Sequence, residues 1–288
     1  MHTLATDMLR IFCRLGLIFL SGMPVLAHAG LPQASAVPGG IAVVPLGSVT
    51  AGADKPQTWF NDQHVLVTAD HGQWYAVVGL PLATKPGAHE LTVRIDGKAK
   101  ALRFEVGTKD YPEQHITLKD KGKVELSPGN EARAAREIAE IKELKRHWRD
   151  APDTDLALIM PVHGRLASRF GLRRFFNGQP RAPHVGLDLA VPSGTPVEAS
   201  AQGTVLAADD FFFNGKTVFL DHGNGLITMY CHLDRIDVRP GEGVGKGQVL
   251  GLSGQTGRAT GPHLHWSVVL NGAMVDPELF VPAELAQQ

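Results

Sequence analysis

The segment TGRATGPHLHW (residues 256–266) carries two histidines, His263 and His265, directly after a glycine-proline pair. A second segment, HVGLD (residues 184–188), begins with a histidine and ends with an aspartate. If both segments are β-strands, side chains two or four residues apart lie on the same face of the strand. The polar side chains of both segments can then converge on one point without any helix, which is the geometry of a metal site.

The chemistry of this set favours zinc. Two imidazoles and one carboxylate are ligands that a catalytic Zn²⁺ takes, and they leave one coordination position for water. A further histidine, His232, ends another apolar segment, MYCHL (residues 229–233). Any one of these histidines, taken alone, is better explained as a separate surface or core residue. The whole set, on β-like segments beside turn glycines, predicts a joint metal site.

The segment from Gly164 to Phe280 resembles the lysostaphin-type zinc metallopeptidases, which cleave peptidoglycan stem peptides or their cross-links. The matching motifs occur in the order of the family, so chance is a poor explanation of the match. They are SRFGLR (168–173), HVGLD (184–188), SGTPV (193–197), YCHL (230–233), VGKGQVLG (244–251) and TGRATGPHLH (256–265).

The resemblance implies a role for each matching residue. It makes His184, Asp188 and His265 the ligands of one Zn²⁺ in the catalytic domain, and His263 and His232 the catalytic pair. In the implied mechanism a zinc-activated water attacks the scissile carbonyl. One imidazole takes a proton from this water and passes a proton to the leaving amine, and the other stabilises the oxyanion. The sequence leaves open which histidine is the base.

Three residues are candidates for substrate contact. Tyr230 would share the face of His232 by strand alternation, and it fits a packed strand aromatic at least as well. Arg173 and Arg258 stand near the histidine motifs, and a guanidinium group binds a carboxylate through two parallel hydrogen bonds. A solubilising surface is the alternative for the arginines of this region. Those before the first histidine motif are Arg165, Arg169, Arg173, Arg174 and Arg181.

The resemblance implies an endopeptidase that hydrolyses cross-links of peptidoglycan, with stem peptides and cross-links as its partners. A Gram-negative setting would imply the bond between D-alanine and meso-diaminopimelate. The formal net charge of −1 gives no support for nucleic-acid binding. The sequence leaves open the bond that is cut, the oligomeric state and any protein adaptor.

Residues 1–29 have the pattern of a signal peptide. Two arginines precede an apolar run over residues 15–26, and the tripeptide AHA (27–29) follows as a cleavage site. The run is too short to span a bilayer comfortably. We therefore expect export to the periplasm with no stable membrane insertion. One of the two cysteines falls in this segment, and the other, Cys231, is expected to be a buried small hydrophobe.

We expect a mainly β chain with four parts. These are the signal peptide (1–29), an N-terminal immunoglobulin-like β-sandwich (30–118), a helical linker (119–155) and an antiparallel β metallopeptidase domain (156–288). The N-terminal part contains short alternating runs, two of them joined by Asp96-Gly97 at the place of a tight hairpin turn. It resembles the small β domain that precedes the peptidase in some Gram-negative members of the family.

Two local patterns refine this organisation. Apolar residues at helical spacing predict one helix over about 130–149, with Asn130 as its N-cap. The pair Asn224-Gly225 is a strong hairpin signal between two apolar runs. That hairpin would carry His232 back toward the strand with the metal ligands.

Three alternative functions are considered. A non-catalytic regulator would bind cell wall and activate other hydrolases, as relatives that lost metal ligands do, but here every matching position is filled. A latent enzyme would be closed by its N-terminal domain or by the loop at 174–183, which the sequence leaves open. A lipoyl-type carrier is suggested by VGKGQVLG (244–251), yet Lys246 lacks the tip geometry of an attachment site. Zinc content together with hydrolysis separates an active enzyme from the regulator and the carrier.

Overall fold

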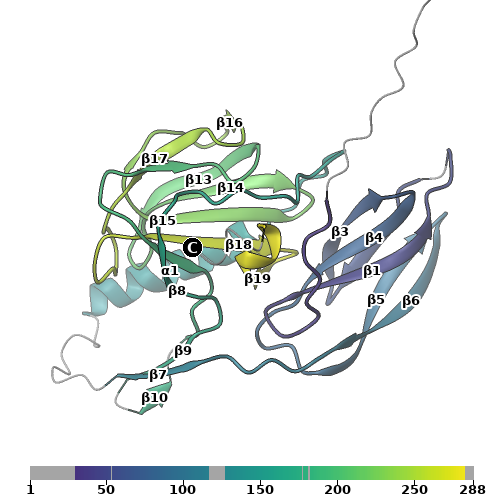
Figure 1. Ribbon diagram of the computed structural model, residues 1–288, viewed down its shortest axis with the longest axis horizontal. Helices are drawn as coiled ribbons and strands as arrows, with labels where there is room; N and C mark the ends of the chain where they lie inside the picture. The colour runs from purple at the N-terminus through teal and green to yellow at the C-terminus, as the bar shows by residue number, and fades with distance from the viewer. Residues whose placement is uncertain (1–29, 53, 117–126, 177, 181, 283–288) are drawn as a thin grey trace, which may run out of the picture.

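The computed structural model describes residues 30–52, 54–116, 127–176, 178–180 and 182–282. The predicted signal peptide lies outside these residues. The described chain is mainly β and forms two β units that lie beside each other, with one long helix on the C-terminal unit (Figure 1). Within the described ranges, no helix has both the length and the apolar character needed to cross a bilayer.

The N-terminal unit is one antiparallel sheet of six strands in the order β1-β4-β3-β2-β5-β6. Contacts between the end strands β1 and β6 make this sheet nearly closed. Because side chains alternate between the two faces of β5, Leu91 and Val93 both lie in the buried core of the sheet. The finer description as an immunoglobulin-like sandwich stays a prediction. The strands are β1 (Ile41–Ser48), β2 (Gln57–Phe60), β3 (Gln63–Asp70), β4 (Gln73–Gly79), β5 (Gly87–Ile95) and β6 (Lys98–Val106).

The C-terminal unit is a larger antiparallel sheet whose main path runs β16-β13-β14-β15-β18-β11-β8. Short strands extend it, since β12 pairs with β17 and β19 pairs with β18. The bounds are β8 (Arg165–Ser168), β11 (Leu187–Ala190), β12 (Pro196–Glu198), β13 (Gly203–Phe211), β14 (Gly215–Gly223), β15 (Leu226–Ile236), β16 (Gly243–Val244), β17 (Val249–Ser253), β18 (Leu264–Leu270) and β19 (Ala273–Val275), followed by the 3₁₀ turn η2 (Pro277–Phe280).

Both predicted hairpin turns are confirmed. Asp96 and Gly97 have φ of 49° and 74° and join β5 to β6, with Ile95 opposite Lys98. The corresponding pair at 224–225 has φ of 50° and 75° and joins β14 to β15. Positive φ at both central residues is the backbone of a type I′ turn, whose twist matches that of the strands it joins.

The helix α1 (Pro128–Lys145) begins earlier than the pattern predicted. Ser127, not Asn130, is the N-cap, because its hydroxyl accepts a hydrogen bond from the Asn130 backbone N–H at 3.4 Å. Ile141 and Leu144 pack on an apolar cluster over β13, β14 and β15. Trp148 lies beyond the last turn, so the predicted C-terminal end near 149 was also wrong.

A small sheet connects the two units along the lower side of Figure 1. Its strands are β7 (Glu113–Ile116), β9 (Arg173–Phe176) and β10 (Gln179–Pro180). The strand β7 follows the N-terminal sheet in the chain and pairs in parallel with β9. After β9 the chain passes through β10 and then reaches the HVGLD segment at residue 184. The exit from the N-terminal unit is thereby joined to the region that leads into the predicted metal site.

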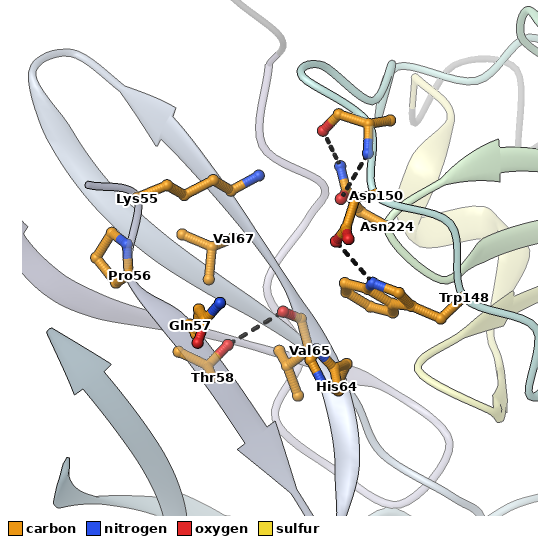
Figure 2. A pocket seen from close by; sticks show the side chains of 11 residues that line it. Lys55, Pro56, Gln57, Thr58, His64, Val65, Val67, Trp148, Asp150 and Asn224 are labelled. Carbon is orange, nitrogen blue, oxygen red and sulfur yellow. Dashed lines mark hydrogen bonds between the residues drawn. The ribbon is translucent and has the colours of Figure 1, made fainter. Parts of the chain in front are cut away.

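The two units also meet at a polar seam. The Asn271 side-chain oxygen accepts a hydrogen bond from the Gly79 N–H at 2.6 Å, and its amide donates to the Gly79 oxygen at 3.1 Å. Between the two units there is also a cavity of about 240 Å³, lined from one side by Lys55 and Val67 and from the other by Trp148 (Figure 2). The seam lies at Asn271, directly after β18 ends, whereas the HVGLD segment runs into β11, which pairs with the beginning of β18.

Candidate metal centre

Two neighbouring strands bring the predicted ligands together. Asp188 on β11 stands directly opposite His265 on β18 in the antiparallel register. His184 precedes β11. Gly186, between His184 and Asp188, allows this segment to approach the β18 backbone closely. A Cβ at Gly186 would lie 2.5 Å from the Trp266 carbonyl oxygen and 2.8 Å from the His265 ring. Glycine at this position therefore lets the chain pass close to the β18 backbone.

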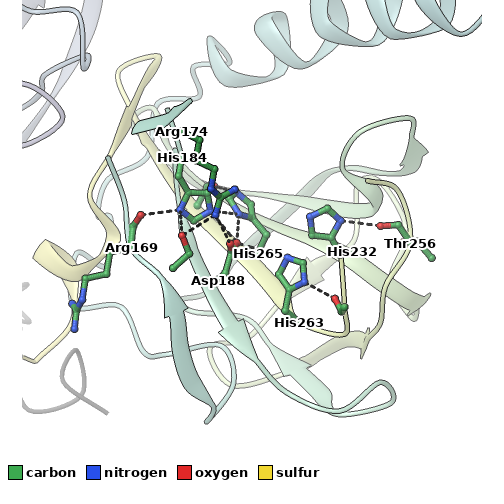
Figure 3. A network of polar contacts seen from close by, with 11 residues as sticks. Arg169, Arg174, His184, Asp188, His232, Thr256, His263 and His265 are labelled. Atoms are coloured by element: carbon green, nitrogen blue, oxygen red, sulfur yellow. Dashed lines mark hydrogen bonds and ion pairs between the residues drawn. The ribbon is translucent and has the colours of Figure 1, made fainter. Parts of the chain in front are cut away.

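Three side-chain atoms converge in the site (Figure 3). The distance from His184 Nε2 to Asp188 Oδ1 is 2.9 Å, and that from His265 Nδ1 to Asp188 Oδ1 is 2.8 Å. The two ring nitrogens are 3.1 Å apart. Two imidazole nitrogens and a carboxylate oxygen in one cluster fit the donor set of a zinc site.

The remaining ring nitrogens of these histidines have their own partners. His184 Nδ1 lies 2.8 Å from the Arg169 carbonyl oxygen, which requires this nitrogen to carry the proton. The Ser267 hydroxyl lies 2.9 Å from His265 Nε2. Outer hydrogen bonds of this kind fix the orientation of metal-binding imidazoles. They leave His184 Nε2 and His265 Nδ1 as the atoms that face the carboxylate.

The charge state of the cluster follows from its contacts. Burial alone would raise the pKa of Asp188, but its close contacts with the His184 and His265 imidazoles hold it well below its usual range. Burial also lowers the pKa of His265. An ionised carboxylate beside neutral imidazoles is the form in which these groups bind a divalent metal.

The other two histidines lie beside this cluster. The rings of His232 and His263 have centroids 4.7 Å apart, and His263 Nε2 is 3.7 Å from Asp188 Oδ1. Each ring is held by a backbone oxygen, His263 Nδ1 by Gly261 at 2.8 Å and His232 Nδ1 by Thr256 at 2.9 Å. Burial lowers the pKa of His232 to about 4. The structure thus brings all five predicted metal-site and catalytic residues into one cluster.

Tyr230 is not brought to this cluster. Its side chain is buried in the core, where its hydroxyl accepts hydrogen bonds from the Ser200 N–H at 2.8 Å and the Thr228 hydroxyl at 2.9 Å. Simple alternation fails because His232 has φ of 63° and the pairing of β14 with β15 shifts register here. Cys231 is buried as predicted, and burial raises its thiol pKa to about 12.

The predicted arginines take different positions. The Arg258 guanidinium stacks over the Phe213 ring at 4.3 Å, on the loop that also carries Thr256. Arg173 pairs with Glu113 of β7 at 2.9 Å, within the small sheet. The arginine beside the cluster is instead Arg174.

Arg174 was grouped in the sequence with its neighbours and was given no separate role. Its Nη2 lies 3.1 Å from the Ser168 hydroxyl and 3.9 Å from Asp188 Oδ2. Ser168 itself stands opposite Asp188 in the pairing of β8 with β11. The sequence signal that could have separated Arg174 from Arg173 is strand alternation in RRFF (173–176), because it places these two side chains on opposite faces.

Comparison with known proteins supports the arrangement. Residues 182–277 match the family model of peptidase family M23, and residues 34–109 match that of the peptidase family M23 N-terminal domain. A crystal structure of a Pseudomonas aeruginosa protein assigned to peptidase M23 is 44% identical. It superposes with a TM-score of 0.72 over 85% of this chain and 95% of that chain.

Curated relatives match over a shorter region. Peptidoglycan DD-endopeptidase ShyA of Vibrio cholerae is 44% identical over 113 residues, which are 39% of this chain and 26% of the relative. DD-carboxypeptidase/endopeptidase Mpg of Neisseria meningitidis is 40% identical over 116 residues, 40% of this chain and 27% of the relative. The match thus spans about a quarter of the length of these relatives. With the structural match over 85% of its length and both family regions, the chain belongs to peptidase family M23, the lysostaphin-type metallopeptidases.

Proposed function

We propose that this chain is a zinc-dependent endopeptidase that hydrolyses peptide cross-links of peptidoglycan. The observation that carries the proposal is the convergence of His184 Nε2, Asp188 Oδ1 and His265 Nδ1 at 2.8–3.1 Å. The substrate class is supported by the relatives, of which ShyA is named a peptidoglycan DD-endopeptidase and Mpg a DD-carboxypeptidase/endopeptidase. We propose His184, Asp188 and His265 as the ligands of one Zn²⁺.

When bound, Zn²⁺ supplies Lewis acidity that polarises a carbonyl and lowers the pKa of a water toward neutrality. His263 performs the proton transfers, and His232 orients the water. Their Nδ1–H groups donate to Gly261 and Thr256 oxygens, so each ring presents an Nε2 lone pair. We assign the base to His263, because its Nε2 is 3.7 Å from a ligand oxygen of Asp188. It takes the proton of the attacking water and returns one to the leaving amine, while His232 Nε2 accepts a hydrogen bond that orients the water.

The substrate is proposed to be the bond between D-alanine and meso-diaminopimelate, outside the cytoplasmic membrane in the periplasm. Stem peptides of this kind carry free carboxylates, which suit guanidinium partners. Arg258 is proposed to hold one of them, since stacking on Phe213 fixes the plane of its guanidinium group. Arg173 remains a second, more distant candidate because it is engaged with Glu113.

The proposed organisation follows the same function. A signal peptide over 1–29 would direct export, and the β unit at 30–118, with an immunoglobulin-like sandwich as its proposed class, would precede a helical linker at 119–155. The peptidase domain would occupy 156–288 and contain every residue of the proposed site. The family regions at 34–109 and 182–277 fall within the two proposed β domains.

The test is digestion of purified cross-linked muropeptides by the protein, followed by mass spectrometry. We compare the wild type with His184→Ala, with a chelated sample and with His71→Ala, whose imidazole is 80% exposed on the N-terminal sheet. We expect the wild type and His71→Ala to convert dimers to monomers and the other two samples to leave dimers intact. Absence of cleavage by a zinc-loaded wild type would contradict the proposal and favour a binding regulator.

A further inference from the structure

We propose that Tyr111, on the segment that leaves the N-terminal sheet, is a positioning residue for the metal ligand His184. The inference rests on the proposed zinc function and extends it to a residue of a different unit. Tyr111 lies between β6 and β7, far in sequence from the HVGLD motif. Tyr111 contacts Gly171, and the backbone of Gly171 is hydrogen-bonded to His184.

The Tyr111 ring occupies the space next to Gly171. A Cβ built on Gly171 would lie 1.9 Å from Tyr111 Cδ1 and 2.1 Å from Cε1, so the ring sits directly against this backbone. The φ of Gly171 is +83°, a conformation that glycine adopts without steric cost. The ring and the glycine backbone therefore form a close contact that admits no other side chain at position 171.

The backbone around Gly171 holds His184 at three points. The Gly171 N–H donates to the His184 oxygen at 2.7 Å, and the His184 N–H donates to the Leu172 oxygen at 3.0 Å. The Arg169 oxygen accepts the hydrogen bond from the His184 imidazole at 2.8 Å. The segment 169–172 thus fixes both the main chain and the ring orientation of the ligand.

Tyr111 is itself fixed by the N-terminal unit. Its hydroxyl donates to the Pro38 oxygen at 2.8 Å. Its ring meets Phe170, within the segment 169–172, edge-on at a centroid distance of 6.1 Å. A Cβ at Gly39 would lie 2.6 Å from the Phe170 ring and 2.7 Å from the Tyr111 hydroxyl, so these groups are closely packed. Burial raises the pKa of Tyr111, which keeps the hydroxyl a donor. Through Tyr111, the N-terminal unit therefore packs against and supports the segment 169–172, which orients His184.

The expected effect is on metal affinity. Loss of the groups that orient a metal-binding histidine typically weakens metal binding about 10- to 100-fold. Tyr111→Ala would leave a void beside Gly171 and allow the segment 169–172 to shift. Tyr111→Phe keeps the ring in place and removes only the hydrogen bond to Pro38, so its zinc affinity should stay near that of the wild type.

The experiment uses the full chain and measures zinc affinity by competition with a chromophoric chelator, together with thermal unfolding of the metal-free protein. Phe60→Ala is the control, because Phe60 is buried in the N-terminal core and its loss destabilises that unit without touching Gly171. We expect zinc binding in Tyr111→Ala to be weaker by at least about threefold and by up to about tenfold. Phe60→Ala should bind zinc as the wild type does, despite a lower melting temperature. If Tyr111→Ala does not fold, Tyr111→Leu is measured against the same limit.

A loss below about threefold in the Tyr111 variant, or an equal loss in Phe60→Ala, overturns the inference. Failure of the proposed function looks different, since the wild type would then bind no zinc or leave dimers uncut. Wild-type zinc binding and hydrolysis with an unaffected Tyr111 variant would remove only the role of Tyr111.

Discussion

Asp188 and His265 face each other across the antiparallel pair of β11 and β18, with Asp188 Oδ1 2.8 Å from His265 Nδ1. The same oxygen is 2.9 Å from His184 Nε2. One carboxylate oxygen therefore meets both imidazoles of the proposed metal site, and the paired strands β11 and β18 set its contact with His265. A site on such elements is held more precisely than one built on loops alone.

Replacing Asp188 with Asn keeps the shape of the side chain and removes its charge. We expect zinc affinity to fall by more than the about 10- to 100-fold that loss of an outer hydrogen-bond partner costs. The measurement is zinc content after dialysis against a weak chelator. Asp155→Asn is the control, since Asp155 pairs with Lys246 at 2.9 Å on the surface. Retained zinc in Asp188→Asn would contradict the assigned ligand.

His263→Ala and His232→Ala should separate proton transfer from metal binding. We expect both variants to keep their zinc, and we expect His263→Ala to lose about 10²- to 10⁴-fold in kcat, the usual contribution of a general acid or base. His232→Ala should lose less, because His232 only orients the water. The measurement combines metal analysis with muropeptide hydrolysis. A variant that loses its zinc would show that the residue acts as a ligand, and full activity would show that it takes no part in proton transfer.

Arg258→Ala should act on substrate handling. A hydrogen bond to a charged group contributes about 1.5–3 kcal/mol, so we expect kcat/KM to fall about tenfold or more while zinc stays bound. Arg239→Ala, at an exposed position of another loop, is the matched control. Unchanged kinetics in Arg258→Ala would remove the proposed carboxylate contact.

The buried imidazole of His222 should make stability depend on pH. Its Nδ1 lies 2.7 Å from the Gln202 oxygen and its Nε2 lies 2.8 Å from the Thr228 hydroxyl, and burial lowers its pKa. As the pH falls below about 6.5, the unfolded chain binds a proton before the folded chain does. The free energy of unfolding therefore decreases by at most about 1.4 kcal/mol per pH unit for this group.

The check is urea unfolding of the metal-free protein at pH 7 and pH 5. We expect His222→Gln to lose less of its unfolding free energy between these values than the wild type does. Because the substitution has its own cost, only the two pH slopes are compared. Parallel slopes would show that His222 is not responsible for the dependence.

The sequence placed both histidine motifs on strands, and Asp188 and His265 do lie on β11 and β18, whereas His184 and His263 precede these strands. It failed for Tyr230, since the left-handed backbone at His232 breaks that alternation. Such a conformation depends on surrounding contacts, here the Asn214 oxygen that accepts from the His232 N–H at 2.8 Å. The pattern of residues around His232 does not indicate its contact with Asn214.

The same limit applies to other missed features. The pairing of β7 with β9 joins residues about 60 positions apart, and nothing in either segment alone indicates its partner. The helix start was missed for a local reason, because Ser127 and Pro128 form a better N-terminal signal than Asn130. The two hairpin turns were found because their Asp-Gly and Asn-Gly pairs act within a few residues.

The φ of 63° at His232 has a cost for the protein. A residue with a Cβ is held there against a preference of about 1–2 kcal/mol, which glycine would not have to overcome. Replacement by glycine would thus relax the main chain and remove the imidazole in one step. The backbone at this position lowers stability while the proposed mechanism needs the imidazole, so the most stable version of the fold and the proposed active version are different sequences.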